Sequence, residues 1–328
     1  MKKAAILVIA FLGVSIRPLY AVDLLDVFKF YRNPEVKLQQ ENVPPYDPAQ
    51  PHGVVSPLTA YIGQVILRLA SVKSIKDARE FHVPDLKPGE SMVEFVDPRK
   101  FAVIEDKVAR RNYVGVMESL VVSRNVEDVF KMSTDYNHLA QVLPGLKISK
   151  IVDRQANRVD VETWRDTELS IFGTRKNYSL ITNIIWPTQD TNKKIIKSQL
   201  LRGDEKNKKY QGVIFMDSVW YFESCGEQCT HIFYMGFSLL GFDYQKTPPF
   251  FPFMSKEIRK KIVSGVTQSG AISSLAAIVR WEDARFRDRD IASFTADDKK
   301  IIDKEVKVRL KKLKKQGRIR IDWEAVFS

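Results

Sequence analysis

The sequence predicts an α+β fold in which seven antiparallel strands precede one long helix. Between residues 113 and 241, apolar, β-prone segments alternate with short turn-like stretches. Residues 255–285 then form a single long helical pattern. Two short helical segments directly after the first strand are an unusual opening for such a sheet. The 328 residues leave room for an N-terminal extension and a basic helical tail around this domain.

The first 21 residues have the pattern of a secretory signal peptide. Lys2 and Lys3 supply the positive start, and Ala4–Val14 is apolar but shorter than the roughly 20 residues that span a bilayer. Ala21 is a small residue at the expected cleavage point, although Arg17 leaves retention of the segment as an alternative. No cysteine follows the apolar segment, so a lipoprotein signal is absent. We expect a periplasmic or secreted protein.

Residues 22–112 form an N-terminal extension without a recognised motif. The proline-rich residues 42–57 predict an extended linker. Leu58–Phe81 carries an apolar helical stripe, which we expect to dock on the main domain or to cover its cavity. Val83–Pro98 is predicted to be loop, and Phe101–Ile104 to be a short strand or edge element.

The two short helices follow the first strand, which begins at Tyr113 and closes at Val122. Asn125 is placed to cap the first helix, with acidic residues in its first turn. Asp135 is placed to cap the second helix, and Pro144-Gly145 ends it. The six further strands are predicted at Lys147–Asp153, Arg158–Thr167, Lys176–Trp186, Lys193–Arg202, Tyr210–Ser224 and Cys229–Gly241.

The stretch VEDVFKMSTDYNHLAQVLPGLKISKIVDR resembles the START-like (SRPBCC) superfamily of helix-grip proteins, of the polyketide cyclase and coenzyme Q-binding type. The matching features are the helix around Val129-Phe130, Asp135-Tyr136, Leu143-Pro144-Gly145 and the strand that follows. The resemblance covers residues 113–285 and leaves 286–328 as the tail. It implies a seven-stranded sheet wrapped around the long C-terminal helix, with an apolar ligand bound between them.

The apolar residues of the strand Tyr210–Ser224 lie on both of its faces. Phe215, Val219 and Tyr221 share one face with Asp217, whereas the other face is also apolar. We therefore expect the sheet to be covered on both sides, with the N-terminal extension as one candidate cover. The sequence does not decide which of the two faces lines a cavity.

Cys225 and Cys229, the two cysteines of the chain, flank a turn between two predicted strands. In an exported protein this spacing favours a disulfide at the end of a hairpin. A metal site and free thiols are the alternatives, but none of the four histidines has ligand spacing to this pair. No metal and no cofactor are expected.

The long helix contains an unusual number of small residues. Gly265 and Gly270 lie in its interior, where each glycine is about 1 kcal/mol less favourable than alanine. Such residues either let the sheet approach closely or leave a cavity between helix and sheet. The aromatic strand residues and the helix together supply the cavity candidates Trp164, Tyr178, Phe215, Trp220, Tyr234, Val266, Gly270 and Ser273.

Two segments are candidates for membrane contact. The loop of residues 247–254 is rich in proline and aromatic residues, and Phe250, Phe251 and Phe253 suit either a lipid interface or a hydrophobic plug. Residues 299–320 carry eleven Lys and Arg against two acidic residues, a net +9 of the chain's +12. The lysine candidates for anionic headgroups are Lys311, Lys312, Lys314 and Lys315.

The tail is predicted to be an amphipathic helix that begins at Thr295 and ends at Gly317. Its apolar stripe is formed by Ile302, Val306, Leu310 and Leu313. A helix docked on the domain by this stripe is the alternative to membrane contact. Nucleic acid is not an expected partner of an exported protein.

We find no catalytic motif, phosphate-binding loop or metal-ligand pattern in the sequence. The leading hypothesis is an exported binding or carrier protein for an apolar ligand, such as a lipid or quinone, at a membrane surface. The alternatives are a cyclase- or hydrolase-type enzyme, which needs polar groups that converge in the cavity, and a non-enzymatic interaction scaffold. The oligomeric state is left open.

Overall fold

A computed structural model describes residues 57–78, 81, 83–101, 113–169, 173–202, 213–240 and 252–327. The predicted signal peptide, the proline-rich linker before residue 57, and residues 102–104 of the predicted edge element lie outside this part of the chain. The strands are β1 (Ser91–Val96), β2 (Tyr113–Val122), β3 (Leu146–Gln155), β4 (Arg158–Leu169), β5 (Gly173–Trp186), β6 (Lys193–Arg202), β7 (Val213–Gly226), β8 (Cys229–Leu240) and β9 (Ile319–Ile321). The helices are α4 (Pro57–Ser71), α6 (Val126–Ser133), α7 (Pro252–Glu282), α8 (Ala296–Lys315) and α9 (Trp323–Phe327). Short 3-10 turns lie at Ile75–Asp77, Pro98–Lys100, Leu139–Gln141 and Ile291–Ser293.

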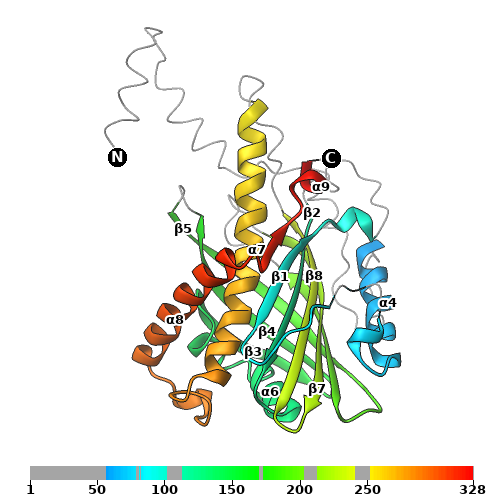
Figure 1. Cartoon of the computed structure of the whole chain (residues 1–328), viewed down its shortest axis with the longest axis vertical. Helices are drawn as coiled ribbons and strands as arrows, with labels where there is room; N and C mark the ends of the chain where they lie inside the picture. Colours follow the sequence, from blue (N-terminus) through cyan, green and yellow to red (C-terminus); the bar gives the residue numbers. More distant parts are fainter. Residues whose placement is uncertain are drawn as a thin grey trace.

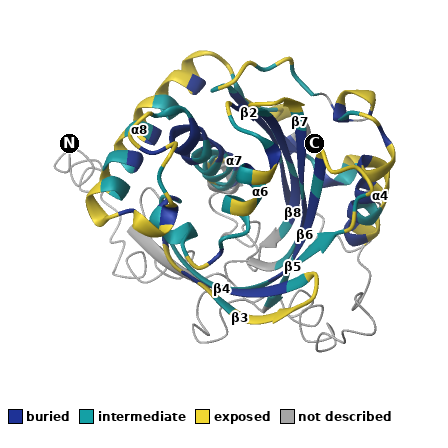
Figure 2. Ribbon diagram, turned by 90° about the horizontal axis from the view of Figure 1, so that it is seen from below, coloured by how far each residue is buried: buried dark blue, intermediate teal, exposed yellow. Residues whose placement is uncertain are grey.

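The strands form one sheet in the order β3-β4-β5-β6-β7-β8-β2-β1-β9. The seven predicted strands correspond to β2–β8, and every pair among them is antiparallel. Figure 1 shows α7 running along the sheet, with α8 beside it. Seen from below in Figure 2, the sheet curves around α7 and α6, while α4 lies on its convex side. The predicted α+β fold, with a sheet wrapped around a long helix, is confirmed.

The sheet has two more strands than the sequence predicts. β1 pairs antiparallel with β2, and the three residues of β9 pair parallel with β1. The prediction of loop for Val83–Pro98 is therefore wrong over Ser91–Val96. Both faces of β1 are buried, so its sequence SMVEFV lacks the polar alternation by which strands are recognised. A three-residue strand such as β9 is too short to give any periodic signal.

Three predicted helices have different bounds in the structure. The helix predicted over Leu58–Phe81 ends at Ser71, because Ser74 caps the separate turn Ile75–Asp77 in a capping box. The second short helix is only a 3-10 turn, since the Asp135 carboxylate accepts from His138 Nδ1 at 2.8 Å instead of capping a helix. The long helix begins at Pro252, three residues before the predicted cap Ser255.

Two predicted N-caps and the predicted stop at Gly145 are confirmed. The Asn125 side chain accepts from the backbone of Asp128 at 2.9 Å and so caps α6. Thr295 and Asp298 form a capping box at the start of α8. Gly145, which ends the second helical segment, has φ +75°, and an added Cβ would lie 2.8 Å from the Asp166 carbonyl oxygen. Only glycine fits that close approach without strain.

The convex face of the sheet is covered by α4. Its stripe Leu58, Ile62, Ile66 and Leu69 is fully buried in one cluster with the β7 and β8 side chains Tyr221 and Phe233. The predicted cover from the N-terminal extension is thereby confirmed. Beneath α4, the carboxylate of Asp217 is fully buried 3.5 Å from Lys197 Nζ, and burial raises its pKa to about 6.

The predicted disulfide between Cys225 and Cys229 is present at the tip of the β7–β8 hairpin, with the two Cα atoms 5.0 Å apart. The helix α7 contains a segment, Arg259–Glu282, that is long and apolar enough to cross a membrane. The helix lies inside the curved sheet (Figure 2). Core helices of globular proteins are also apolar, so this position accounts for the apolar composition of the segment.

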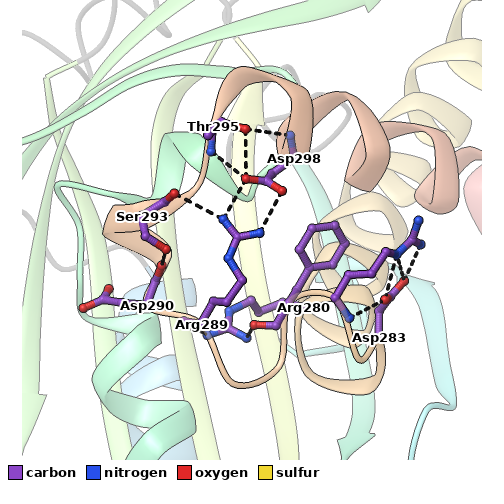
Figure 3. A network of polar contacts seen from close by, with 9 residues as sticks. Arg280, Asp283, Arg289, Asp290, Ser293, Thr295 and Asp298 are labelled. Carbon is purple, nitrogen blue, oxygen red and sulfur yellow. Dashed lines mark hydrogen bonds and ion pairs between the residues drawn. The ribbon is translucent and has the colours of Figure 1, made fainter.

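A polar network joins the end of α7 to the start of α8 (Figure 3). The Arg280 guanidinium is buried, lies 4.4 Å from the Trp281 ring centre and donates to the backbone carbonyls of Phe286 and Arg289. Arg289 in turn binds both carboxylate oxygens of Asp298, at 2.8 Å each. The network fixes the connection, and α8 then docks by Ile302, Val306 and Leu313 of its predicted stripe.

Candidate functional site

The helix α7 presents two different stripes to the sheet. One stripe, which includes Val263, Thr267 and Ala271, is fully buried, and among the strands α7 contacts mainly β2 and β1. The adjacent stripe is half-buried and consists mainly of small residues, among them Ser269, Gly270, Ser273 and Ala277. Ser269 lies close to Arg165 of β4, so this second stripe faces the concave side of the sheet. Small, partly accessible residues here are what a ligand space between helix and sheet requires.

A carboxyl group is buried where α7 crosses β2. Glu118 is 3% exposed, and Ser274 Oγ donates to its Oε2 at 2.6 Å. Gly270 makes room for the other oxygen, since an added Cβ would lie 2.2 Å from Glu118 Oε1. Burial raises the pKa of Glu118 to about 7, and the hydrogen bond from Ser274 and the charge of Arg165 oppose that shift only in part. Glu118 therefore titrates near neutral pH.

Arg165 projects from β4 into the same interior. Its Nη1 lies 3.4 Å from Ser269 Oγ, which is its one hydrogen-bond partner among the described residues. Burial lowers the pKa of the guanidinium, while its electrostatic interactions with Tyr234 and Glu118 oppose that shift. An arginine has five N–H donors in a fixed fork, so most of them remain for another acceptor.

An aromatic pair from β7 and β8 completes the arrangement. Trp220 and Tyr234 lie opposite each other in the sheet, with ring centres 4.4 Å apart. The Tyr234 hydroxyl extends over Gly236, where an added Cβ would lie 2.1 Å from the oxygen. Burial raises the pKa of Tyr234, chiefly by desolvation and then by the charge of Glu118, so the hydroxyl stays protonated.

Glu118, Arg165 and Tyr234 together form what we call the interior donor cluster. The three residues come from β2, β4 and β8, and electrostatic interactions couple each of them to the others. When Glu118 is protonated, all three carry hydrogen-bond donors and Arg165 carries a positive charge. Apolar side chains such as Val116, Trp220 and Val266 surround the cluster. The arrangement suits an oxygen acceptor at the end of an otherwise apolar molecule.

The structure separates the predicted cavity residues into two groups. Trp220, Tyr234, Val266, Gly270 and Ser273 lie on the side of α7. Phe215 instead packs in the convex-face cluster under α4, with its ring centre 5.8 Å from that of Tyr113. Trp164 and Tyr178 contact each other, with ring centres 5.2 Å apart. Because neighbouring strand residues alternate and Arg165 points inward, this pair lies on the convex face.

The membrane-contact candidates are placed as follows. Phe250 and Phe251 lie outside the described residues, and Phe253 is described only as backbone in the first turn of α7. On α8, Lys311, Lys312 and Lys315 are exposed. Lys314 is also exposed and donates to Gln268 Oε1 of α7 at 2.9 Å.

Sequence reasoning missed two members of the interior donor cluster. Glu118 follows Val114 and Val116 and precedes Leu120 on one face of its strand, and a carboxyl group in such a row signals a buried acid. Arg165 gives a similar signal, because it follows Val159, Val161 and Thr163 on one face of its strand, while the other charged residues of that strand lie on the opposite face.

No protein-family model and no curated protein matches this sequence. Solved structures with similar folds include the Zhui aromatase/cyclase from Streptomyces sp. R1128, at 12% identity and a TM-score of 0.39, over 53% of this chain and 98% of that one. The STAR-related lipid transfer protein from Xanthomonas axonopodis has 11% identity and a TM-score of 0.36, over 53% and 90% of the two chains. Human STARD10 has 9% identity and a TM-score of 0.43, over 67% and 79%.

At these identities and scores the likeness carries no argument about function. The helix-grip arrangement predicted from the sequence, a sheet wrapped around the long helix, is confirmed by the strand order β3 to β8 followed by β2, and by α7 inside the curve (Figure 2).

Two glycines of α7 test how tightly the cluster is held. Gly270→Ala is expected to lower the free energy of unfolding by about 1 to 2 kcal/mol, because its Cβ would collide with Glu118. Gly265→Ala is the matched control, since nothing lies within 4 Å of its Cβ position. Its higher helix propensity should stabilise the protein by up to about 1 kcal/mol. Urea denaturation of both variants measures the difference, and equal stabilisation by both would contradict the contact at Gly270.

Proposed function

We propose that the protein binds and carries an apolar ligand that has an oxygen acceptor, such as a carbonyl or carboxylate, at one end. The ligand lies between the half-buried stripe of α7 and the concave face of the sheet. The observation that carries this proposal is the interior donor cluster, which places Glu118, Arg165 and Tyr234 among apolar side chains. Lipids and quinones both have the required combination of an apolar body and a terminal oxygen.

The chemistry of the cluster explains the choice of an acceptor. Arg165 has one hydrogen-bond partner among the described residues, so its remaining N–H groups would be satisfied by a bound oxygen. A protonated Glu118 leaves the positive charge of Arg165 largely uncompensated below pH about 7. A ligand that ends in a cation would meet only donors and a positive charge, which is unfavourable in a poorly solvated interior.

We further propose that the protein acts after export, in the periplasm or outside the cell, at a membrane surface. The signal-peptide pattern of residues 1–21 and the disulfide between Cys225 and Cys229 support export. A protein that carries apolar molecules must collect and release them where these molecules are soluble, which is at a membrane.

Displacement of a fluorescent apolar probe tests the ligand class. Palmitic acid and its methyl ester should both displace the probe, whereas hexadecane should compete at least about tenfold more weakly because it has no acceptor. Arg165→Met should weaken the binding of palmitic acid by about tenfold or more and leave the binding of hexadecane unchanged. Lys150→Gln, which removes a charge from the exposed strand β3, serves as the control. Equal competition by all three compounds would contradict recognition of an oxygen.

A specific observation also supports a second candidate function. A carboxyl group with a pKa of about 7, beside a tyrosine and an arginine, is poised for general acid–base catalysis. A cyclase- or hydrolase-type enzyme would use Glu118 in this way. Hydrolysis of nitrophenyl acyl esters that is lost in Glu118→Gln would favour the enzyme, and equal background rates in both proteins would favour the carrier.

A further inference from the structure

The helix α8 has two opposite faces with different tasks. Its buried stripe, which includes Ile302, Val306 and Leu313, docks against the domain. On the opposite side, lysines recur every three or four residues, which places them on one face of the helix. All are exposed, and we call them the lysine stripe: Lys300, Lys304, Lys307 and Lys311. The docking of α8 therefore turns a continuous basic face outward.

An exposed apolar side chain lies beside the lysine stripe. Val308 is 57% exposed, and it lines a shallow hollow together with the stripe and Asp303. Most of the hollow's lining surface is apolar, since lysine stems contribute carbon while their amines extend outward. A face that combines exposed lysines with an apolar side chain suits a surface that offers both anions and an apolar layer.

The charges of the stripe are mostly uncompensated. Lys300 pairs with Asp297 at 2.8 Å. Lys304, Lys307 and Lys311 form no ion pair with any residue that the structure describes. Asp303 is the one acidic residue in the lining of the hollow. The surrounding residues 299–320 have a net charge of +9, so the partner of this face is anionic.

We propose that the lysine stripe of α8 docks the protein on an anionic lipid membrane, with Val308 inserted between the headgroups. This inference rests on the membrane-surface part of the proposed function and identifies the surface that makes the contact. Basic residues attract anionic headgroups, and an apolar residue on the same face enters the interfacial layer. A nucleic acid or an acidic protein would use the lysines but would gain nothing from Val308.

Co-sedimentation of the full-length protein with vesicles tests the proposal. Binding is expected to phosphatidylcholine vesicles that contain phosphatidylglycerol, to weaken at high salt and to be nearly lost without the anionic lipid. Lys304→Gln/Lys307→Gln/Lys311→Gln should bind about 100-fold more weakly, because each lysine near such a surface contributes about fivefold. The matched control Lys73→Gln/Lys87→Gln/Lys150→Gln removes the same charge from exposed lysines elsewhere and should bind within about threefold of wild type.

A second variant separates a membrane from other anionic partners. Val308→Ser should weaken vesicle binding and leave the weak binding of a DNA duplex or of polyglutamate unchanged. The proposal is overturned if the triple stripe variant binds vesicles like wild type, or if Val308→Ser has no effect on vesicles. Stronger binding of DNA or polyglutamate than of vesicles also overturns it. Palmitic acid should displace the fluorescent apolar probe from the stripe variants as it does from wild type, so failure of membrane docking is distinct from failure of ligand carriage.

Discussion

Replacement of Arg280 by alanine is expected to lower the free energy of unfolding by about 3 kcal/mol and to loosen α8 from α7. The Arg280 side chain is 4% exposed and lies between the rings of Trp281 and Phe294, at 4.4 and 5.2 Å from their centres. The substitution leaves the carbonyls of Phe286 and Arg289 without their charged donor and opens a gap beside both rings. Each of these effects destabilises the connection shown in Figure 3.

Urea denaturation and limited proteolysis together check this prediction. Cleavage should appear first within residues 286–296, ahead of cleavage in the sheet. Arg285→Ala is the control, because Arg285 is exposed and makes only surface contacts, namely ion pairs with Asp283 and Glu305 and a cation–π contact with Phe286. If both variants unfold like wild type, Arg280 does not hold the connection.

Glu118→Gln is expected to remove a loss of about 3 kcal/mol in the free energy of unfolding that the wild type undergoes as the pH rises. The pKa of Glu118 rises from 4.5 in the unfolded chain to about 7 in the folded protein. Between these values the folded state keeps a proton that the unfolded chain releases, so the wild type loses stability as pH rises through this window. Glutamine does not titrate, so the variant should gain about 3 kcal/mol relative to wild type between pH 4 and pH 8.

Denaturation of both proteins across this pH range measures the difference. Asp217 and His231 also have shifted pKa values, raised to about 6 and lowered to about 4 respectively. Both residues are present in the two proteins, so their contributions cancel in the comparison. A difference that stays constant with pH would mean that Glu118 is not held protonated in the folded state.

The strand and helix pattern of this chain follows from its sequence because the signals are local. Runs of β-prone residues bounded by turns define β2–β8, and caps such as Asn125 and Thr295 set the starts of α6 and α8. β1 and β9 were missed because they become strands only by pairing with each other and with β2. Their formation depends on long-range contacts that a local pattern does not contain.

The site was predicted less completely than the fold, for a related reason. Strand alternation places Phe215 and Trp220 on opposite faces of the sheet, but it does not predict which face α7 will cover. The structure assigns Phe215 to the convex cluster under α4, while Trp220 lies with Tyr234 on the concave side. Glu118 and Arg165 approach each other only when the sheet curves, so no spacing in the sequence relates them.

Native mass spectrometry of the full-length protein, with organic extraction of bound molecules, tests the central claim most directly. We expect a small apolar molecule with a carbonyl or carboxylate group, bound at one copy per chain and strongly reduced in Arg165→Met. A wild-type protein that carries no such molecule and also fails to bind palmitic acid would contradict ligand carriage between α7 and the sheet.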